Sequence, residues 1–322
     1  MLHIYDQLPE GLLQRDATRL HEVLPGPSLI HLPGQKSDTL FVSVLLHGNE
    51  TTGWEAVREL LLKNGEQPLP RSVCLFIGNV AAARHGQRHL AEQPDYNRIW
   101  KGDEDSAEHR MARQVIEHVS KLQLFAAVDI HNNTGKNPHY ACVNRLDQSY
   151  LHLATLFGRT VVYFLKPDTV MSMAMAPLCP AVTVDCGQPG MPQGTSHILD
   201  YLNACLHLSE FPQQPVTPHD IDLFHTVATV KVPPELEVGF GHESHDISLL
   251  PDIDRFNFNE LPAGTAFGQV SKVGTQPFMV RDEQNRDVTA RFFEINGHWI
   301  QTRTPVMPSM LTLDLEIIKQ DC

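Results

Sequence analysis

The sequence lacks the features that mark secreted and membrane proteins. Its six cysteines form no CxxC pair, which fits reduced thiols in a cytoplasm better than a disulfide framework. No apolar run approaches the length of a membrane span. The first residues also lack the charged start and apolar stretch of a secretory signal. We therefore expect a cytoplasmic protein with no membrane partner.

Clustered basic residues are missing as well. The formal net charge is −13 with histidine neutral, and no basic block occurs. Nucleic acids and anionic membranes are bound through groups of lysine and arginine, so we expect neither as a partner. A small-molecule substrate stays possible, because an anionic one needs only a few local arginines. The sequence leaves the oligomeric state open.

The segment from about Pro27 to Pro212 alternates short apolar runs with helical patterns. Helical spacing marks the stretches around Trp54–Leu61, Met111–Leu122 and Ile198–Leu206. Strands are predicted at Ser28–Leu32, Thr39–Leu46, Ser72–Ile77, Phe125–Ile130, Tyr140–Val143, Thr160–Leu165 and Ala181–Val184. This alternation predicts an α/β fold with a mostly parallel or mixed sheet flanked by helices.

The composition changes after Phe211–Pro215. Short β-rich pieces follow at Thr226–Val232, Ala266–Val273, Pro277–Val280, Arg291–Glu294 and Met310–Leu315, separated by turn residues. We expect residues 1–212 to form a larger α/β domain and residues 213–322 a smaller β-domain. Residues 1–26 read as an N-terminal extension with a helix around Gly11–Leu24.

Two histidines and a glutamate indicate a hydrolytic zinc site. His47 and Glu50 are three residues apart, so one turn can aim both at a single ion, and His131 would come from a neighbouring strand. Catalytic zinc takes three such protein ligands and keeps a fourth position for water. We expect one Zn²⁺ ion per chain.

The position of these residues matters, because the chain has 18 histidines and an isolated HxxE pattern carries little information. His47 and His131 each follow a predicted buried strand, Leu40–Leu46 and Leu124–Ile130. In open α/β sheets, ligands bind at the carboxyl ends of the strands. Placement therefore favours a metal site over two packing histidines.

Several motifs, in this order and spacing, resemble the succinylglutamate desuccinylase/aspartoacylase family of zinc carboxypeptidase-like hydrolases. The motifs are His47-Gly48-Asn49-Glu50, Gly78-Asn79 followed by Arg88, Asp95–Trp100, Asp129-Ile130-His131 and Val182–Gly187. The resemblance implies a carboxypeptidase-like α/β domain followed by a β-domain. It also implies hydrolysis of the amide bond of an N-acyl amino acid.

The resemblance assigns roles to residues around the metal. His47, Glu50 and His131 would bind zinc, and Asp129 would orient a ligand imidazole, as carboxylates beside metal-bound histidines commonly do. Asp129 read alone is as well explained as a strand-end carboxylate that caps a turn.

Three further residues would handle the substrate. Arg88 would polarise the scissile carbonyl and stabilise the oxyanion, and Asn97 with Arg98 would bind a substrate carboxylate. Without the surrounding motifs, Asn97 and Arg98 would read as part of a solvated loop.

The chain departs from the family pattern at two places. Asp185 stands where the family has a glutamate as general base, so its side chain is one methylene shorter. The stretch Met171–Pro177 lacks the arginine found in family members that act on aspartate or glutamate derivatives. It could pack in the core or line a pocket for an uncharged substrate part. Cys186 is a weaker candidate for a nucleophile, since no histidine is tied to it by a motif.

The leading hypothesis is a zinc metallohydrolase of the amidohydrolase type, in which Asp185 takes a proton from an activated water and returns it to the leaving amine. Two alternatives remain. The chain could be a catalytically altered or inactive zinc-binding or regulatory member of the family, or an exopeptidase that acts on short peptides.

Overall fold

The computed structural model describes residues 1–241 and 245–321, which form two compact units. The first unit comprises Met1–Asn132 and His139–His225, and the second comprises Asn133–Pro138 and the chain from Thr226 onward. The first unit thus extends to His225, whereas the change in composition predicts a boundary at Pro212. The residues between these points include the strand Asp222–His225, which pairs with the sheet of the first unit.

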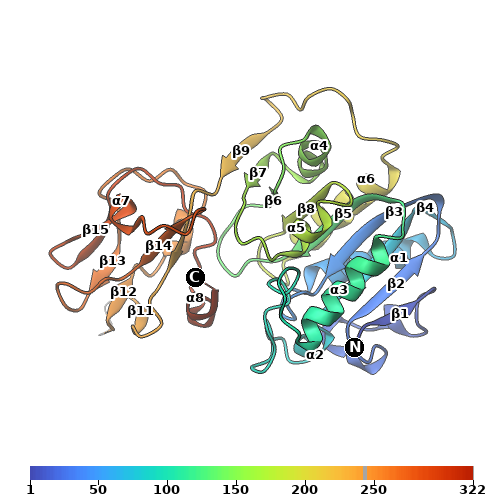
Figure 1. The fold of residues 1–322 in the computed structure, drawn as a ribbon, viewed down its shortest axis with the longest axis horizontal. Helices are drawn as coiled ribbons and strands as arrows, with labels where there is room; N and C mark the ends of the chain where they lie inside the picture. Colours follow the sequence, from blue (N-terminus) through green and yellow to red (C-terminus); the bar gives the residue numbers. More distant parts are fainter. Residues whose placement is uncertain (242–244, 322) are drawn as a thin grey trace. The chain divides into compact units, whose positions relative to one another are not determined.

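A nine-stranded sheet forms the centre of the first unit (Figure 1). Its order is β1-β2-β4-β3-β5-β8-β6-β7-β9. Neighbours run parallel except β2 with β4 and β6 with β8. The predicted mostly parallel, mixed sheet is therefore confirmed. The strands are β1 (His3–Tyr5), β2 (Ser28–Leu32), β3 (Gly34–Val44), β4 (Leu69–Ile77), β5 (Leu124–His131), β6 (Tyr140–Val143), β7 (Thr160–Tyr163), β8 (Ala181–Asp185) and β9 (Asp222–His225).

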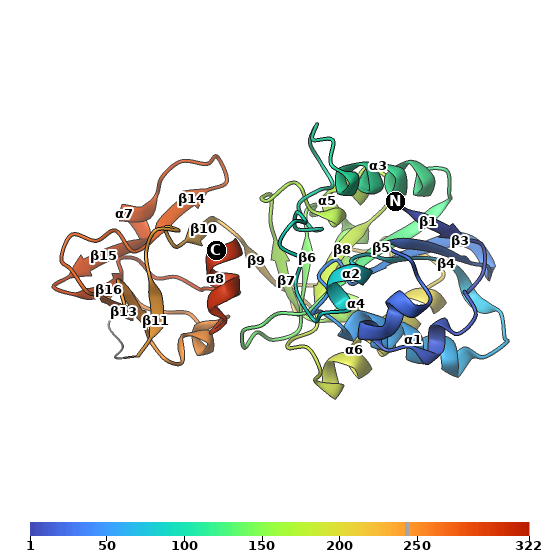
Figure 2. The same cartoon turned by 90° about the horizontal axis from the view of Figure 1, so that it is seen from below.

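Helices cover both faces of this sheet. Figure 2 shows α3 and α5 on one side and α1, α4 and α6 on the other. Because both faces are covered, the central strands are almost continuously apolar, as in Leu40–Val44, where Ser43 is the one polar residue. None of the helices in the described part of the chain has the length and hydropathy needed to span a membrane. The helices are α1 (Thr52–Asn64), α2 (Val80–Ala83), α3 (Ala107–Val119), α4 (Gln148–Phe157), α5 (Met171–Met175) and α6 (Pro192–His207).

The N-terminal segment differs from the predicted helix over Gly11–Leu24. It forms two short 3-10 helices, Leu12–Gln14 and Ala17–Glu22. The break lies at Asp16, whose backbone is extended and whose side chain accepts a hydrogen bond from Arg19 N. An aspartate at this position starts a new helix rather than continuing the old one. The apolar spacing correctly marks a buried face, but not one continuous helix.

The second unit is rich in short strands and has its own apolar core. Five strands form a sheet in the order β11-β12-β13-β16-β15, and β10 pairs with β14. These smaller sheets confirm the predicted β-rich character of the C-terminal third. The elements are β10 (Ala228–Lys231), β11 (Val238–Phe240), β12 (Ile247–Leu249), the 3-10 helix Ile253–Phe256, β13 (Ala266–Val270), β14 (Met279–Asp282), α7 (Thr289–Phe292), β15 (Phe293–Asn296), β16 (Trp299–Thr302) and α8 (Leu315–Asp321).

The strand predicted at Met310–Leu315 is wrong. Met310 has a positive φ of 64°, and the next residue donates its backbone N–H to the side chain of Asn257. Leu311 O in turn accepts a hydrogen bond from Asn257 Nδ2. Backbone groups that a strand would use for pairing are therefore satisfied by a side chain.

The segment Asn133–Pro138 belongs to the second unit although it follows β5 in the chain. A Cβ atom on Gly135 would lie 1.8 Å from Leu311 O, so this position requires glycine. Lys136 Nζ lies 3.2 Å from Oδ2 of the buried Asp254. Further hydrogen bonds join Thr134 with Thr312 and Asn137 with Met310.

Candidate metal centre

Three neighbouring strands of the first unit, β3, β5 and β8, end at one edge of the sheet. In the pairing register Ser43 lies beside Asp129 on β5, and His131 lies beside Asp185 on β8. Parallel strands bring their carboxyl ends together, which is where open α/β sheets bind ligands. We call this edge, formed by the ends of β3, β5 and β8, the carboxyl edge.

The turn after β3 brings His47 back to the carboxyl edge. The chain leaves the strand through Leu45, whose φ of 56° is unusual for a residue other than glycine. Gly48 then packs against α2, where a Cβ atom would lie 2.2 Å from Ala83 N. Glycine between His47 and Glu50 is therefore required by this close approach.

His47, Glu50 and His131 converge at the carboxyl edge. His47 Nδ1 lies 2.8 Å from Glu50 Oε1, and His131 Nδ1 lies 2.7 Å from Glu50 Oε2. All three side chains are buried, and their candidate ligand atoms lie within 4.8 Å of one another. Among the described residues, this is the one such group of three or more. The structure thus brings together the three predicted ligands.

The second nitrogen of each imidazole faces a different carboxylate. His47 Nε2 lies 2.9 Å from Asp95 Oδ1, and His131 Nε2 lies 2.8 Å from Asp129 Oδ2. Metal-bound histidines typically donate their outer N–H to such a group, which fixes the ring orientation. Both rings therefore point Nδ1 toward Glu50, and the donor set of two imidazoles and a carboxylate fits Zn²⁺. The contact predicted for Asp129 is present.

Charge pairing keeps these buried groups ionised. Burial opposes the charged form of Glu50, but His47 and His131 hold its pKa below the ordinary value for glutamate. Burial likewise opposes ionisation of Asp95, but His47 and Arg88 lower its pKa. For His131 burial lowers the pKa, yet Asp129 and Glu50 raise it well above its usual value.

Arg88 lies at the same cluster. Its Nη2 donates to Asp95 Oδ2 at 2.8 Å, and its Nη1 lies 3.5 Å from Glu50 Oε1. Asp95 therefore joins Arg88 to His47. The guanidinium is held beside the candidate metal ligands, and its role in polarising a carbonyl stays a prediction.

Asn97 and Arg98 follow Asp95 along the chain. Asn97 Nδ2 lies 3.4 Å from His131 Nε2, while its Oδ1 accepts a hydrogen bond from Met171 N. Arg98 Nη1 donates to Asn97 O at 3.0 Å. Asn97 is buried beside His131, and Arg98 is half-buried. Binding of a substrate carboxylate by this pair stays a prediction.

The sequence profile of the "Succinylglutamate desuccinylase/Aspartoacylase catalytic domain" matches residues 36–188. That range includes all the predicted site residues. Residues 36–188 are therefore similar to the catalytic domain of the succinylglutamate desuccinylase/aspartoacylase family.

Individual known proteins are similar to parts or most of this chain. The succinylglutamate desuccinylase of Serratia proteamaculans (strain 568) is 35% identical over 92 residues, which cover 27% of this chain and 27% of that protein's length. The solved structure of succinylglutamate desuccinylase from Chromobacterium violaceum has a TM-score of 0.55 at 17% identity, covering 84% of this chain and 85% of that one. Murine aminoacylase 3 has a TM-score of 0.52 at 15% identity, covering 89% and 93%. At these identities the structures show a shared fold.

Asp185, where the family has glutamate, ends β8 beside His131. Two donors orient its carboxylate: Tyr140 OH lies 3.3 Å from Oδ2, and Gly187 N lies 3.2 Å from Oδ1. Tyr140 comes from β6, where it is the direct neighbour of Asp185 in the register. The base predicted from the resemblance is thus fixed from both sides at the carboxyl edge.

The stretch around α5 favours core packing over a substrate pocket. Met171 and Met175 are fully buried in the main apolar core, and Ser172 accepts a hydrogen bond from Thr183. Cys186 is also fully buried, and burial raises the pKa of its thiol. A thiol held neutral in this way is a poor nucleophile.

Asp95 is the residue of this site whose role the sequence did not reveal. It lies 48 positions from His47 on a loop with no regular secondary structure, so no periodicity points to the contact. The available signal was its place at the start of the Asp95–Trp100 motif, two residues before Asn97. Tyr140 and Asn132 were likewise not assigned a role.

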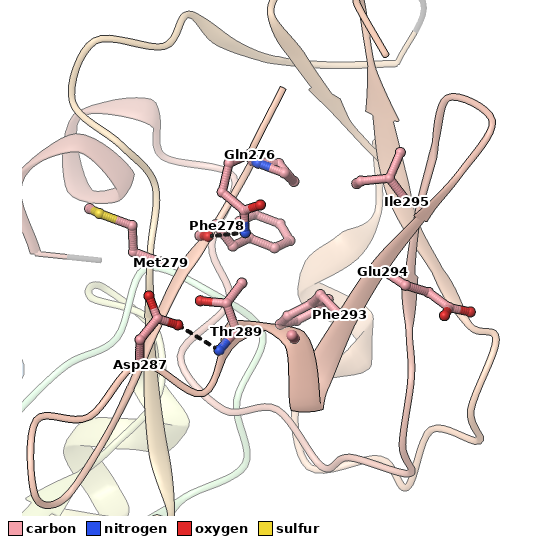
Figure 3. A pocket seen from close by; sticks show the side chains of 10 residues that line it. Gln276, Phe278, Met279, Asp287, Thr289, Phe293, Glu294 and Ile295 are labelled. Atoms are coloured by element: carbon pink, nitrogen blue, oxygen red, sulfur yellow. Dashed lines mark hydrogen bonds between the residues drawn. The ribbon is translucent and has the colours of Figure 1, made fainter. Parts of the chain in front are cut away.

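A separate groove of 350 Å³ lies in the second unit. It is lined by residues of β14, α7 and β15 and by the segment before them (Figure 3). Gln276 Nε2 donates to Phe278 O, and Asp287 Oδ1 accepts from Thr289 N. Each of these two bonds spans two residues, whereas Thr289 Oγ1 accepts a hydrogen bond from Val280 N, nine residues away.

Proposed function

We propose that the chain is a zinc-dependent hydrolase that cleaves the amide bond of an N-acyl amino acid or a related small substrate that bears a carboxylate. The observation that carries this proposal is the convergence of His47, Glu50 and His131 at the strand end beside Asp185. The family profile supports the same class of chemistry. The names of two relatives, a desuccinylase and an aminoacylase, support removal of an acyl group.

His47, Glu50 and His131 would hold the metal. When bound, zinc lowers the pKa of water to near neutrality and acts as a Lewis acid toward a carbonyl oxygen. Asp129 and Asp95 fix the two imidazole rings, because each accepts the outer N–H of one ring. The protein thereby fixes both ligand rings in advance.

Asp185 would act as the general base and then as the general acid. Its carboxylate takes a proton from the attacking water and delivers it to the nitrogen of the leaving amine. Tyr140 and Gly187 hold that carboxylate in one orientation. This fixed position supports the role of a side chain one methylene shorter than glutamate.

Arg88 and Arg98 would supply the positive charge toward the substrate. Arg88, held by Asp95, would stabilise the oxyanion that develops on the scissile carbonyl. Arg98 would bind the carboxylate of the amino acid, together with the amide N–H₂ of Asn97, whose oxygen already accepts from Met171 N.

The test is hydrolysis of a panel of N-acyl amino acids and dipeptides by zinc-loaded protein. We expect wild type to cleave at least one N-acyl amino acid. Asp185→Asn should keep its zinc but lower kcat by about 10²–10⁴, the usual contribution of general acid–base catalysis. Asp185→Glu should keep measurable activity.

The short side chain of Asp185 also supports a second function, that of a metal-binding member without catalysis. On this alternative the zinc-loaded wild type cleaves nothing in the panel, and Asp185→Glu gains activity. Such a result would replace the hydrolase by a binding or regulatory protein. Cleavage of dipeptides alone would instead favour an exopeptidase.

A further inference from the structure

Asn132 is a buried residue directly after His131 that the proposed reaction does not use. It is 6% exposed, and its backbone N–H donates to Glu50 Oε2 at 3.1 Å. This bond fixes the same carboxylate oxygen that lies 2.7 Å from His131 Nδ1. The backbone of Asn132 therefore contacts a candidate metal ligand.

The side-chain oxygen of Asn132 caps α1, the helix that begins two residues after Glu50. Thr52 N donates to Asn132 Oδ1 at 3.3 Å. The first N–H groups of a helix have no partner within the helix, and the N-cap residue Thr51 makes no side-chain cap bond here. Asn132 supplies this acceptor from a neighbouring strand end.

The side-chain nitrogen of Asn132 holds the turn that follows Asp185. Its Nδ2 donates to Gly187 O at 2.8 Å and lies 3.2 Å from Cys186 Sγ. Gly187 N in turn donates to Asp185 Oδ1. One amide therefore contacts the start of α1 through its oxygen and the turn after the proposed base through its nitrogen.

We propose that Asn132 is a positioning residue that sets the distance between the metal ligands and the general base Asp185. This inference rests on the proposed function for the role of Asp185. An amide suits the task because it carries an acceptor and two donors on one rigid plane. The distance is critical because the base is short, and a misplacement of about 1 Å can cost on the order of 10² in rate.

Two variants of Asn132 and one control separate positioning from general packing. Asn132→Asp keeps the shape and the acceptor for Thr52 N but removes both donors to the turn. Asn132→Ala removes the side-chain bonds altogether. The control is Asn144→Ala, since Asn144 is equally buried and neither of its amide atoms has a hydrogen-bond partner among the described residues. It follows Val143, which pairs with Val182 at the far end of β8 from Asp185.

The first readout is amide hydrogen exchange and needs no activity. In Asn132→Ala we expect exchange in residues 186–190 and 50–54 to rise by about tenfold or more, because the bonds that close these segments are lost. Asn132→Asp should show the rise in 186–190 alone, because its remaining oxygen still accepts from Thr52 N. Asn144→Ala should match wild type. Equal exchange in all four proteins would overturn the proposal.

The second readout is kinetic. With zinc still bound, both Asn132 variants should lower kcat by about tenfold or more while KM changes little, because the metal and the substrate groups remain in place. In an Asp185→Asn background, Asn132→Ala should cost little further. A full additional loss there would show that Asn132 does not act through Asp185. If the wild type proves inactive on every substrate, the proposed function fails and the exchange experiment decides the role of Asn132.

Discussion

The carboxyl edge of the first unit and the groove of the second unit hold their polar side chains in opposite ways. At the carboxyl edge, Glu50 is buried and lies between two histidines from different elements. In the groove, the side chain of Asp287 is 60% exposed and bonds to a backbone two residues away. Buried charges that hold one another from distant parts of the chain mark a functional site better than a hollow does.

The largest effect is expected for Glu50→Gln. Gln removes the charge that pairs with both His47 and His131, and with it one of three ligands. We expect zinc content to fall from about one per chain toward zero, as it should for His47→Ala and His131→Ala. Metal analysis of the dialysed proteins measures this. Full zinc occupancy in all three variants would contradict the assignment.

A smaller effect is expected for Asp95→Asn. The variant keeps the side-chain shape but weakens the hold on His47 Nε2 and on Arg88. Loss of such an outer partner typically lowers metal affinity by about 10–100-fold. Competition with a chelator measures the affinity. Asp129→Asn should give a loss of similar size, because it changes the equivalent partner of His131.

Asp95→Asn should also make the stability of the zinc-free protein less sensitive to acid. The folded-state pKa of Asp95 is lowered, so this carboxylate contributes stability above the unfolded pKa of about 3.9 and loses it as the pH falls further. Unfolding midpoints measured between neutral pH and about pH 3 should therefore fall more steeply for wild type than for Asp95→Asn. Parallel curves for wild type and variant would show that the contact between Asp95 and His47 does not contribute to the pH dependence of stability.

Arg98→Lys should affect turnover without removing the metal. Lysine keeps the charge but not the planar fork that binds a carboxylate with two hydrogen bonds. We expect kcat/KM for carboxylate-bearing substrates to fall by about tenfold or more. The matched measurement uses the amide analogue of the best substrate, for which wild type and variant should differ less. Equal kinetics on both substrates would make Arg98 structural.

The smallest effect is expected in the groove of the second unit. Glu294→Gln is the same chemical change as Glu50→Gln, made at an exposed side chain that lines the groove. Zinc content and kcat/KM should equal those of wild type. A loss of activity here would show that the groove takes part in the reaction, and the contrast between the two regions would no longer hold.

The sequence predicts the metal group because its three residues lie at or just after the ends of predicted strands. His131 and Asp185 stand at the ends of apolar runs whose register could be expected from parallel pairing. Asp95 could not be found this way, since it reaches His47 from an irregular loop. Bonds such as those of Asn132 also escape prediction, because they require the geometry of three elements at once.

The errors in the fold have a similar cause. The apolar spacing around Leu12 and Leu20 correctly indicates burial, but a local bond at Asp16 divides the helix. At Met310–Leu315 the β-forming residues meet the side chain of Asn257, which lies far away in sequence. Propensity describes the isolated segment, and a side chain from elsewhere overrides it.

The membership of Asn133–Pro138 in the second unit has a consequence for how the protein is made. During synthesis this segment leaves the ribosome with the first unit, but Leu311 and Thr312, which hold it, come near the end of the chain. At about 5–20 residues per second, the delay is on the order of ten seconds. Asn133–Pro138, which directly follows Asn132, therefore cannot make its contacts with Leu311 and Thr312 until well after most strands of the sheet have been synthesised. A hybrid protein that exchanges the C-terminal unit for that of a relative would need to exchange these six residues as well.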